Sequence, residues 1–221
     1  MPSIEHTAPP RIYVSPIEVR EKLISLGIAR DVLARGAQAG FAERANANRF
    51  DPKTAGGYDA WRYPTRYIRQ AQSLIGWRLD DPKNLPLVIS DEHQVILTVS
   101  SGDEQTGQIF GRDPKTKNKK GSVLKAAVER DFSQPDLFGN PLELNKFIDA
   151  MKYPIWILLL YITEDIIRAE LSRPLSLDGN SQVDSWSERI ILDIPTPDTL
   201  YDDEAGDDSG PDILPQVTFK I

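Results

Sequence analysis

The fold is decided by the segment Leu87-Val88-Ile89-Ser90-Asp91-Glu92-His93-Gln94-Val95-Ile96-Leu97-Thr98-Val99 near the middle of the chain. Two apolar, β-branched runs flank a short polar stretch. Runs of this length and composition, separated by polar residues, are typical of two strands joined by a turn. The segment therefore predicts a β-hairpin.

Further strands are expected on the C-terminal side of this hairpin. Residues 153–162 form a second run of β-branched, aromatic and other apolar side chains, and residues 166–171 follow it. The tripeptide Asp178-Gly179-Asn180 then supplies a tight turn before residues 186–194. Consecutive strands with short connections predict an antiparallel sheet.

The first third of the chain instead has the pattern of helices. The capping box Ser15-Pro16-Ile17-Glu18 starts one helix, which ends at Gly27. A second helix is expected over residues 29–45, although Gly36 and Gly40 each weaken it by about 1 kcal/mol relative to alanine. Proline favours the first turn of a helix, so a third helix is expected to begin at Pro64.

Helices followed by strands predict an α+β domain over residues 1–197, with the N-terminal helices packed on one face of the sheet. Glycine and proline recur throughout residues 102–145, so we interpret this segment as a flexible insertion. Within it, residues 122–130 could form two helical turns. Residues 198–221 form an acidic tail, with seven acids and no base between Asp198 and Asp212. Alternating Val217, Phe219 and Ile221 could add a strand at its end.

Composition narrows the protein class. The chain has 221 residues, a net charge of −7 and no cysteine, so disulfides, thiolate metal sites and cysteine nucleophiles are excluded. Residues 1–10 do not resemble a signal peptide, and the longest apolar run, residues 155–162, is far shorter than the roughly 20 residues that cross a membrane. We expect a cytoplasmic protein without a membrane partner.

The most specific short motif is Gln134-Pro135-Asp136-Leu137-Phe138. It resembles the Gln-Leu-(Ser/Asp)-Leu-Phe peptide with which bacterial polymerases, repair factors and mobile-element proteins bind the replicative sliding clamp. Four of the five positions agree, and Pro135 stands where that family usually has leucine. The resemblance implies that Leu137 and Phe138 fill an apolar pocket of the clamp while Gln134 hydrogen-bonds beside it.

The leading functional hypothesis follows from this motif. The chain would be a bacterial accessory or adaptor protein that docks on the sliding clamp during DNA replication, repair or a mobile-element, phage or defence process. The alternative for the same residues is structural, because Leu137 and Phe138 could simply anchor the insertion to the core.

A second hypothesis is a DNA-binding regulatory module. Aromatic residues alternate with arginines in residues 58–69, a mixture suited to stacking on bases and pairing with phosphates. A lysine-rich stretch, residues 112–125, could follow a phosphate backbone. The candidate nucleic-acid-binding residues are Arg62, Arg66, Arg69, Lys115, Lys117, Lys119 and Lys120. The competing interpretation is that the aromatics are core residues and that the lysines are a solvated loop.

The sequence offers little for catalysis. It has two histidines, no serine–histidine–aspartate pattern and no glycine-rich phosphate loop. We therefore expect a protein without catalytic residues, bound metal or cofactor. A third hypothesis is an Mg²⁺-dependent carboxylate nuclease that uses Asp91, Glu92, Asp103 and Glu104, which flank one predicted strand.

Overall fold

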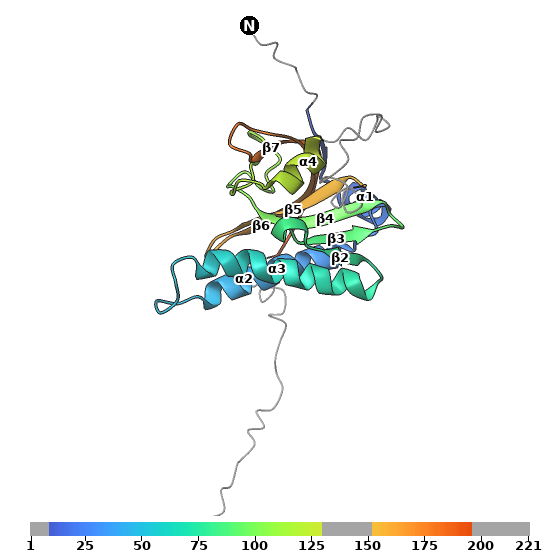
Figure 1. Ribbon diagram of the computed structural model, residues 1–221. Coiled ribbons are helices and arrows are strands. Elements are labelled where there is room, and N and C mark those ends of the chain that lie inside the picture. Colours follow the sequence, from blue (N-terminus) through green and yellow to red (C-terminus); the bar gives the residue numbers. More distant parts are fainter. Residues whose placement is uncertain (1–8, 130–151, 196–221) are drawn as a thin grey trace, which may run out of the picture.

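A computed structural model describes residues 9–129 and 152–195, which form one seven-stranded sheet covered by helices on both faces (Figure 1). The strand order is β1-β7-β6-β5-β4-β3-β2. The strands are β1 (Arg11–Tyr13), β2 (Arg78–Asp80), β3 (Leu87–Ser90), β4 (Val95–Ser101), β5 (Ile155–Ile162), β6 (Ile167–Leu177) and β7 (Val183–Leu192). The helices are α1 (Pro16–Ser25), α2 (Arg30–Asn46), α3 (Ala55–Leu74) and α4 (Ser122–Glu129), with a 3₁₀ turn η1 (Pro82–Asn84). The α+β class expected from the sequence is confirmed.

The sheet is mixed. The predicted hairpin is present as β3 and β4, which pair antiparallel from Ser90–Val95 to Val88–Leu97. Two neighbouring pairs are parallel, however: β1 with β7, and β4 with β5. Parallel neighbours need a long crossover connection, and residues 102–154 between β4 and β5 are such a connection.

Both faces of the central strands are buried. Leu97 of β4 and Leu158 of β5 belong to a core shared with α1, α2 and α3, whereas Ile96 and Ile157 belong to a second core on the opposite face, shared with α4. Figure 1 shows α2 and α3 below the sheet and α4 above it. Burial on both faces explains why β5 is apolar along almost its whole length, rather than alternating.

Helix α3 starts nine residues earlier than the sequence predicted, at Ala55 rather than Pro64. Pro64 is buried in the helix, and a Cβ added at Gly40 of α2 would lie 2.5 Å from its ring. The expectation was wrong because close packing of α3 along α2 offsets the backbone hydrogen bond that a proline inside a helix cannot donate.

The part of the expected insertion that the structure describes is packed against the sheet. Gly102 donates its N–H to the carbonyl of Leu160 at 2.7 Å, and Trp186 Nε1 donates to the carbonyl of Pro114 at 2.8 Å. Residues 102–121 therefore belong to the packed domain and are not a flexible insertion, and α4 confirms the two expected helical turns. The clamp-like peptide Gln134–Phe138 and the acidic tail lie outside the described residues.

Candidate functional site: a basic groove at the end of strand β4

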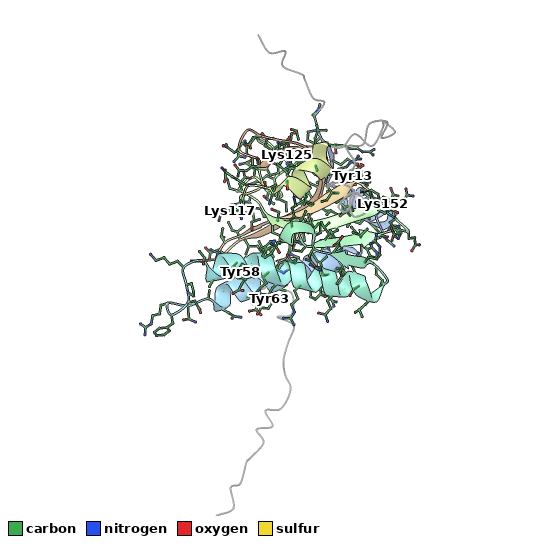
Figure 2. All side chains as sticks on the ribbon, in the orientation of Figure 1. Tyr13, Tyr58, Tyr63, Lys117, Lys125 and Lys152 are labelled. Atoms are coloured by element: carbon green, nitrogen blue, oxygen red, sulfur yellow. The ribbon has the colours of Figure 1, made fainter. Side chains whose placement is uncertain are left out.

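A groove of about 940 Å³ opens at the C-terminal end of β4. It exists because β4 is longer than its neighbour: β3 pairs with β4 only as far as Leu97, so residues 99–101 have no partner strand on that side in the described part of the chain. The walls come from the end of α2, the start of α3, η1, and the loop before α4. Figure 2 shows Tyr58 of α3 and Lys117 of this loop at the same end of the molecule, on opposite sides of the sheet.

The groove is strongly basic. Among the residues that the structure describes, six cationic residues line it, and no aspartate or glutamate does. These residues, together called the basic groove cations, are Arg44, Lys53, Lys83, Lys117, Lys119 and Lys120. A concave surface lined by one sign of charge raises the local concentration of ions of the opposite sign, so the groove is suited to an anionic ligand.

Backbone hydrogen bonds hold the loop before α4, whose residues 117–120 carry three of the groove lysines, in position. Lys117 donates its N–H to the carbonyl of Ser101 at 2.9 Å, and the side chain of Gln182 donates to the carbonyl of Lys117 at 3.1 Å. The N–H of Lys120 donates to the carbonyl of Ser181 at 2.7 Å. The lysine side chains therefore project from a fixed segment and not from a loose loop.

One groove residue has an unmet hydrogen-bonding capacity. Arg44 Nε is buried and has no hydrogen-bond partner among the described residues. Buried polar atoms in proteins are nearly always paired, so an orphaned donor in a cavity wall needs an explanation. Its lack of accessible surface places this donor behind the surface of the groove.

The backbone of η1 adopts an uncommon conformation at the groove wall. Lys83 and Asn84 both have positive φ angles, 47° and 63°. A lysine in this left-handed region is strained, and such residues gather at ligand-binding sites. The strained turn brings Lys83 to the groove.

Arg69 supports this turn from outside the groove. Both of its terminal nitrogens pair with the carboxylate of Asp81, the residue before η1, and the hydrogen bonds from Arg69 lower the pKa of Asp81. Arg69 therefore has a structural partner.

Two aromatic side chains form part of the groove wall. Trp61 donates its ring N–H to the carbonyl of Val99 at 3.1 Å, which fixes the indole against β4. The ring of Tyr58 lies 5.7 Å from that of Trp61 at an angle of 49° and is 56% exposed. Tyr58 is thus held by a fixed neighbour while keeping surface free for a planar ligand group.

Lys120 differs from the other groove lysines in its surroundings. Its Nζ donates to Ser100 Oγ at 2.5 Å, and no ion pair to a carboxylate is found for it among the described residues. Burial lowers the pKa of Lys120 to about 8, because the charged form loses hydration without gaining a counter-charge.

A buried ion pair anchors the loop that leads to the lysines. Arg189 of β7 binds Glu170 of β6 through Nε at 3.0 Å and Nη2 at 2.6 Å, and the two side chains are 2% and 0% exposed. Arg189 also donates to the carbonyl of Gln108, and Glu170 accepts the N–H of Gly107. Asp113 lies 3.4 Å from Arg189, and burial raises the pKa of Asp113.

The structure brings together three of the seven predicted nucleic-acid-binding residues. Lys117, Lys119 and Lys120 line the groove, whereas Lys115 pairs with Asp178 at 3.2 Å and Asp184 at 3.5 Å. The three arginines do not line it: Arg62 binds Asp59, Arg66 is exposed elsewhere on α3, and Arg69 binds Asp81.

Sequence reasoning missed three of the groove cations. Arg44, Lys53 and Lys83 belong to separate segments, and none stands in a cluster of bases that would mark it. No local signal could have identified them.

The carboxylates proposed for a nuclease do not form one site. Asp91 and Glu92 precede β4, whereas Asp103 and Glu104 follow it, so a seven-residue strand separates the two pairs. Asp91 pairs with Arg78, Lys152 and Tyr153, which together hold its pKa well below the usual range, and Arg112 binds both Asp103 and Glu104. Residues 9–129 and 152–195 contain no group of three or more potential metal ligands. The structure therefore does not gather the four carboxylates proposed for a nuclease into one place.

Within the same two ranges, no helix has both the length and the apolar character needed to cross a membrane. No protein-family model, curated protein or solved structure matches this chain. Its function is therefore inferred from the groove and from the motifs in the sequence.

Proposed function

We propose that this protein binds single-stranded nucleic acid in the groove at the end of β4. The observation that carries the proposal is the gathering of six cations around one groove, whose lining among the described residues includes no aspartate or glutamate. Each phosphate neutralised by such a cation releases condensed counterions, which supplies most of the affinity for a nucleic acid.

A single strand fits this groove better than a duplex. The cations line a concave surface, whereas reading a duplex requires a helix or ribbon that projects into its major groove. Tyr58 offers an exposed ring beside the cations, and stacking of a base on an aromatic side chain accompanies phosphate pairing in single-strand binders. Tyr58 and Lys117 both line the groove and lie at the same end of the molecule (Figure 2), so they could contact the bases and backbone of one strand.

The first prediction concerns the groove lysines. Lys117→Glu/Lys119→Glu should weaken binding of a fluorescein-labelled oligo-dT by about 10- to 100-fold, because two charge-assisted contacts are replaced by repulsion. The measurement is fluorescence anisotropy over a range of salt concentrations. The plot of log affinity against log salt should also become shallower, by roughly 0.7 for each phosphate that the variant no longer neutralises.

The matched control reverses two charges on the other predicted surface, Arg62→Glu/Arg66→Glu, outside the groove lining. This variant should retain most of the affinity. If the arginine variant failed to bind and the lysine variant bound normally, the groove would not be the binding site and the aromatic-arginine surface of α3 would be.

A second candidate function is docking on the bacterial sliding clamp, and the sequence match at Gln134–Phe138 favours it. The peptide begins five residues after the last residue of α4, whose first residue, Ser122, lines the groove. An eight-residue helix is about 12 Å long, so the chain leaves α4 close to the groove. A clamp-bound protein with a single-strand groove would act as a DNA-processing accessory factor, in replication, repair or a mobile-element or defence process.

The second prediction tests the clamp peptide. Leu137→Ala/Phe138→Ala should abolish retention on immobilised sliding clamp, because those two side chains are the expected anchors. The control is Leu142→Ala/Leu144→Ala, which removes two apolar side chains from the same region and should leave retention unchanged. Equal retention of the anchor variant and the unmodified protein would exclude this peptide as the docking motif.

A further inference from the structure

Lys120 combines partial burial and a hydroxyl contact with the cationic setting that all the groove lysines share. Its side chain is partly buried where the groove meets β4, its Nζ contacts the hydroxyl of Ser100, and the described charged residues that line the groove around it are all cations. Lys117 and Lys119, by contrast, are exposed. Burial disfavours the charged ammonium form of a lysine.

A lysine in this setting becomes a nucleophile. Burial lowers the pKa of Lys120 to about 8. At pH 7.5 the neutral amine is then roughly 200 times more abundant than in a lysine of ordinary pKa. A neutral lysine amine attacks carbonyl groups, and lysines desolvated beside other cations are the ones that form Schiff bases in enzymes.

We propose that Lys120 is a carbonyl-reactive amine that forms a reversible imine with an aldehyde carried next to a phosphate in the groove. This inference rests on the proposed anion-binding role of the groove, because the basic groove cations would hold the phosphate that brings the aldehyde to Nζ. The aldehyde could belong to an abasic site within a bound strand, or to a free phosphorylated aldehyde. The shared chemistry is an aldehyde and a phosphate on one molecule.

The reaction is balanced without an oxidant, reductant or metal. The lone pair of Lys120 Nζ forms a bond to the aldehyde carbon, and the carbonyl oxygen takes up a proton to give a carbinolamine. Loss of that oxygen as water gives the imine, which hydrolysis returns to amine and aldehyde. Ser100 Oγ lies 2.5 Å from Nζ, so it can take the proton that leaves the attacking amine while its own O–H proton passes to the carbonyl oxygen. The same relay can carry the second amine proton to the hydroxyl that leaves as water.

The third prediction is that borohydride traps this imine. The full-length protein is incubated with a single-stranded oligonucleotide that carries one abasic site, or in a separate arm with pyridoxal 5′-phosphate, and sodium cyanoborohydride is added. Reduction fixes the imine as a stable secondary amine, and peptide mass spectrometry should locate it at Lys120. Lys120→Arg keeps the positive charge and removes the nucleophile, so the adduct yield should fall at least about tenfold.

The matched control is Lys152→Arg, an exposed lysine that does not line the groove. It should give the same adduct yield as the unmodified protein. The trapping rate of the unmodified protein should rise with pH and level off above about pH 9, because a lysine with a pKa of about 8 is then about nine-tenths neutral. A rate that still rises beyond about pH 9.5, or an adduct spread over the exposed lysines, would overturn the assignment.

The abasic-site arm, the pyridoxal phosphate arm and a binding control together distinguish failure of this inference from failure of the proposed function. Anisotropy with an undamaged oligonucleotide is measured on the same samples. Normal binding of that oligonucleotide without an adduct at Lys120 in either arm would overturn this inference and leave the proposed function intact. An adduct at Lys120 with pyridoxal phosphate, but no binding of either oligonucleotide, would support the amine and remove nucleic acid as the ligand. If Lys120→Arg failed to fold, as judged by circular dichroism, the mapped position of the adduct in the unmodified protein would still decide the outcome.

Discussion

Replacing Glu170 with glutamine should lower the free energy of unfolding by about 3–5 kcal/mol, the range found when one partner of a buried ion pair is removed. The substitution keeps the size and shape of the side chain, but it leaves the guanidinium of Arg189 as a buried charge without its main counter-charge. The new amide NH₂ would also face a guanidinium N–H or the N–H of Gly107, so two donors would meet.

The measurement is urea denaturation followed by tryptophan fluorescence. The matched control is Glu104→Gln, which removes the same charge from the exposed pair with Arg112, whose side chains are 61% and 49% exposed. An exposed pair contributes about 1 kcal/mol or less, so the control should be nearly neutral. Equally small effects of both substitutions would contradict the view that Glu170 and Arg189 anchor this loop.

The Glu170 substitution should also weaken ligand binding in the groove. The loop held by Arg189 at Gln108 and Asp113 continues directly into Lys117 and its neighbours. A loosened loop would no longer hold the lysines in position, so oligonucleotide affinity should fall even though Glu170 does not line the groove.

Gly40→Leu should destabilise the protein by about 2–3 kcal/mol through overpacking between α2 and α3. A Cβ at this position would lie 2.5 Å from the ring of Pro64 and 2.8 Å from the backbone carbonyl oxygen of Ala60. Backbone cannot rotate away as a flexible side chain can, so the helices must separate. Leucine has a higher helix propensity than glycine by about 1 kcal/mol, so helix propensity alone would make the variant more stable. Any net destabilisation therefore reports tertiary packing.

The control for this substitution is Gly57→Ala near the start of α3. A Cβ there would meet no other atom within 4 Å. Removing a glycine from an open helical position should stabilise the fold by roughly 0.4–1 kcal/mol, chiefly by reducing the freedom of the unfolded chain. Urea denaturation should show that the Gly40 substitution lowers the free energy of unfolding and that the Gly57 substitution raises it. Equal changes in the free energy of unfolding would mean that α2 and α3 do not pack closely at Gly40.

The sequence predicted the local elements of the fold well. The β3–β4 hairpin, the apolar strand β5 and the capped start of α1 all follow from patterns within a few residues, because side-chain periodicity and capping act at that range. The start of α3 could not be found in this way. Pro64 is a helix-starting signal on its own, and only its packing against Gly40 in another helix shows why the helix continues through it.

The residues of the candidate site also fall into those that the sequence predicted and those that it did not. Lys117, Lys119 and Lys120 were visible as a run of neighbouring bases, and all three line the groove. The arginines of α3 had equally suggestive spacing, but carboxylates at Asp59 and Asp81 bind Arg62 and Arg69. A run of like charges in the sequence shows where the cations are in the chain. It does not show which of those cations are bound by carboxylates in the folded protein.

The sequence by itself determined the α+β class, the central hairpin, the lysine run, and the clamp-like peptide at Gln134–Phe138, whose role remains a prediction. Only the tertiary structure decided that β4 extends past β3, that Arg44, Lys53 and Lys83 join the lysine run around that strand end, and that Lys120 is enclosed beside Ser100. The physical reason is the range of the interactions. Propensity and periodicity act between residues a few positions apart, whereas a groove, an orphaned donor and a lowered pKa arise from desolvation and charge at distances that are short in space and long in sequence.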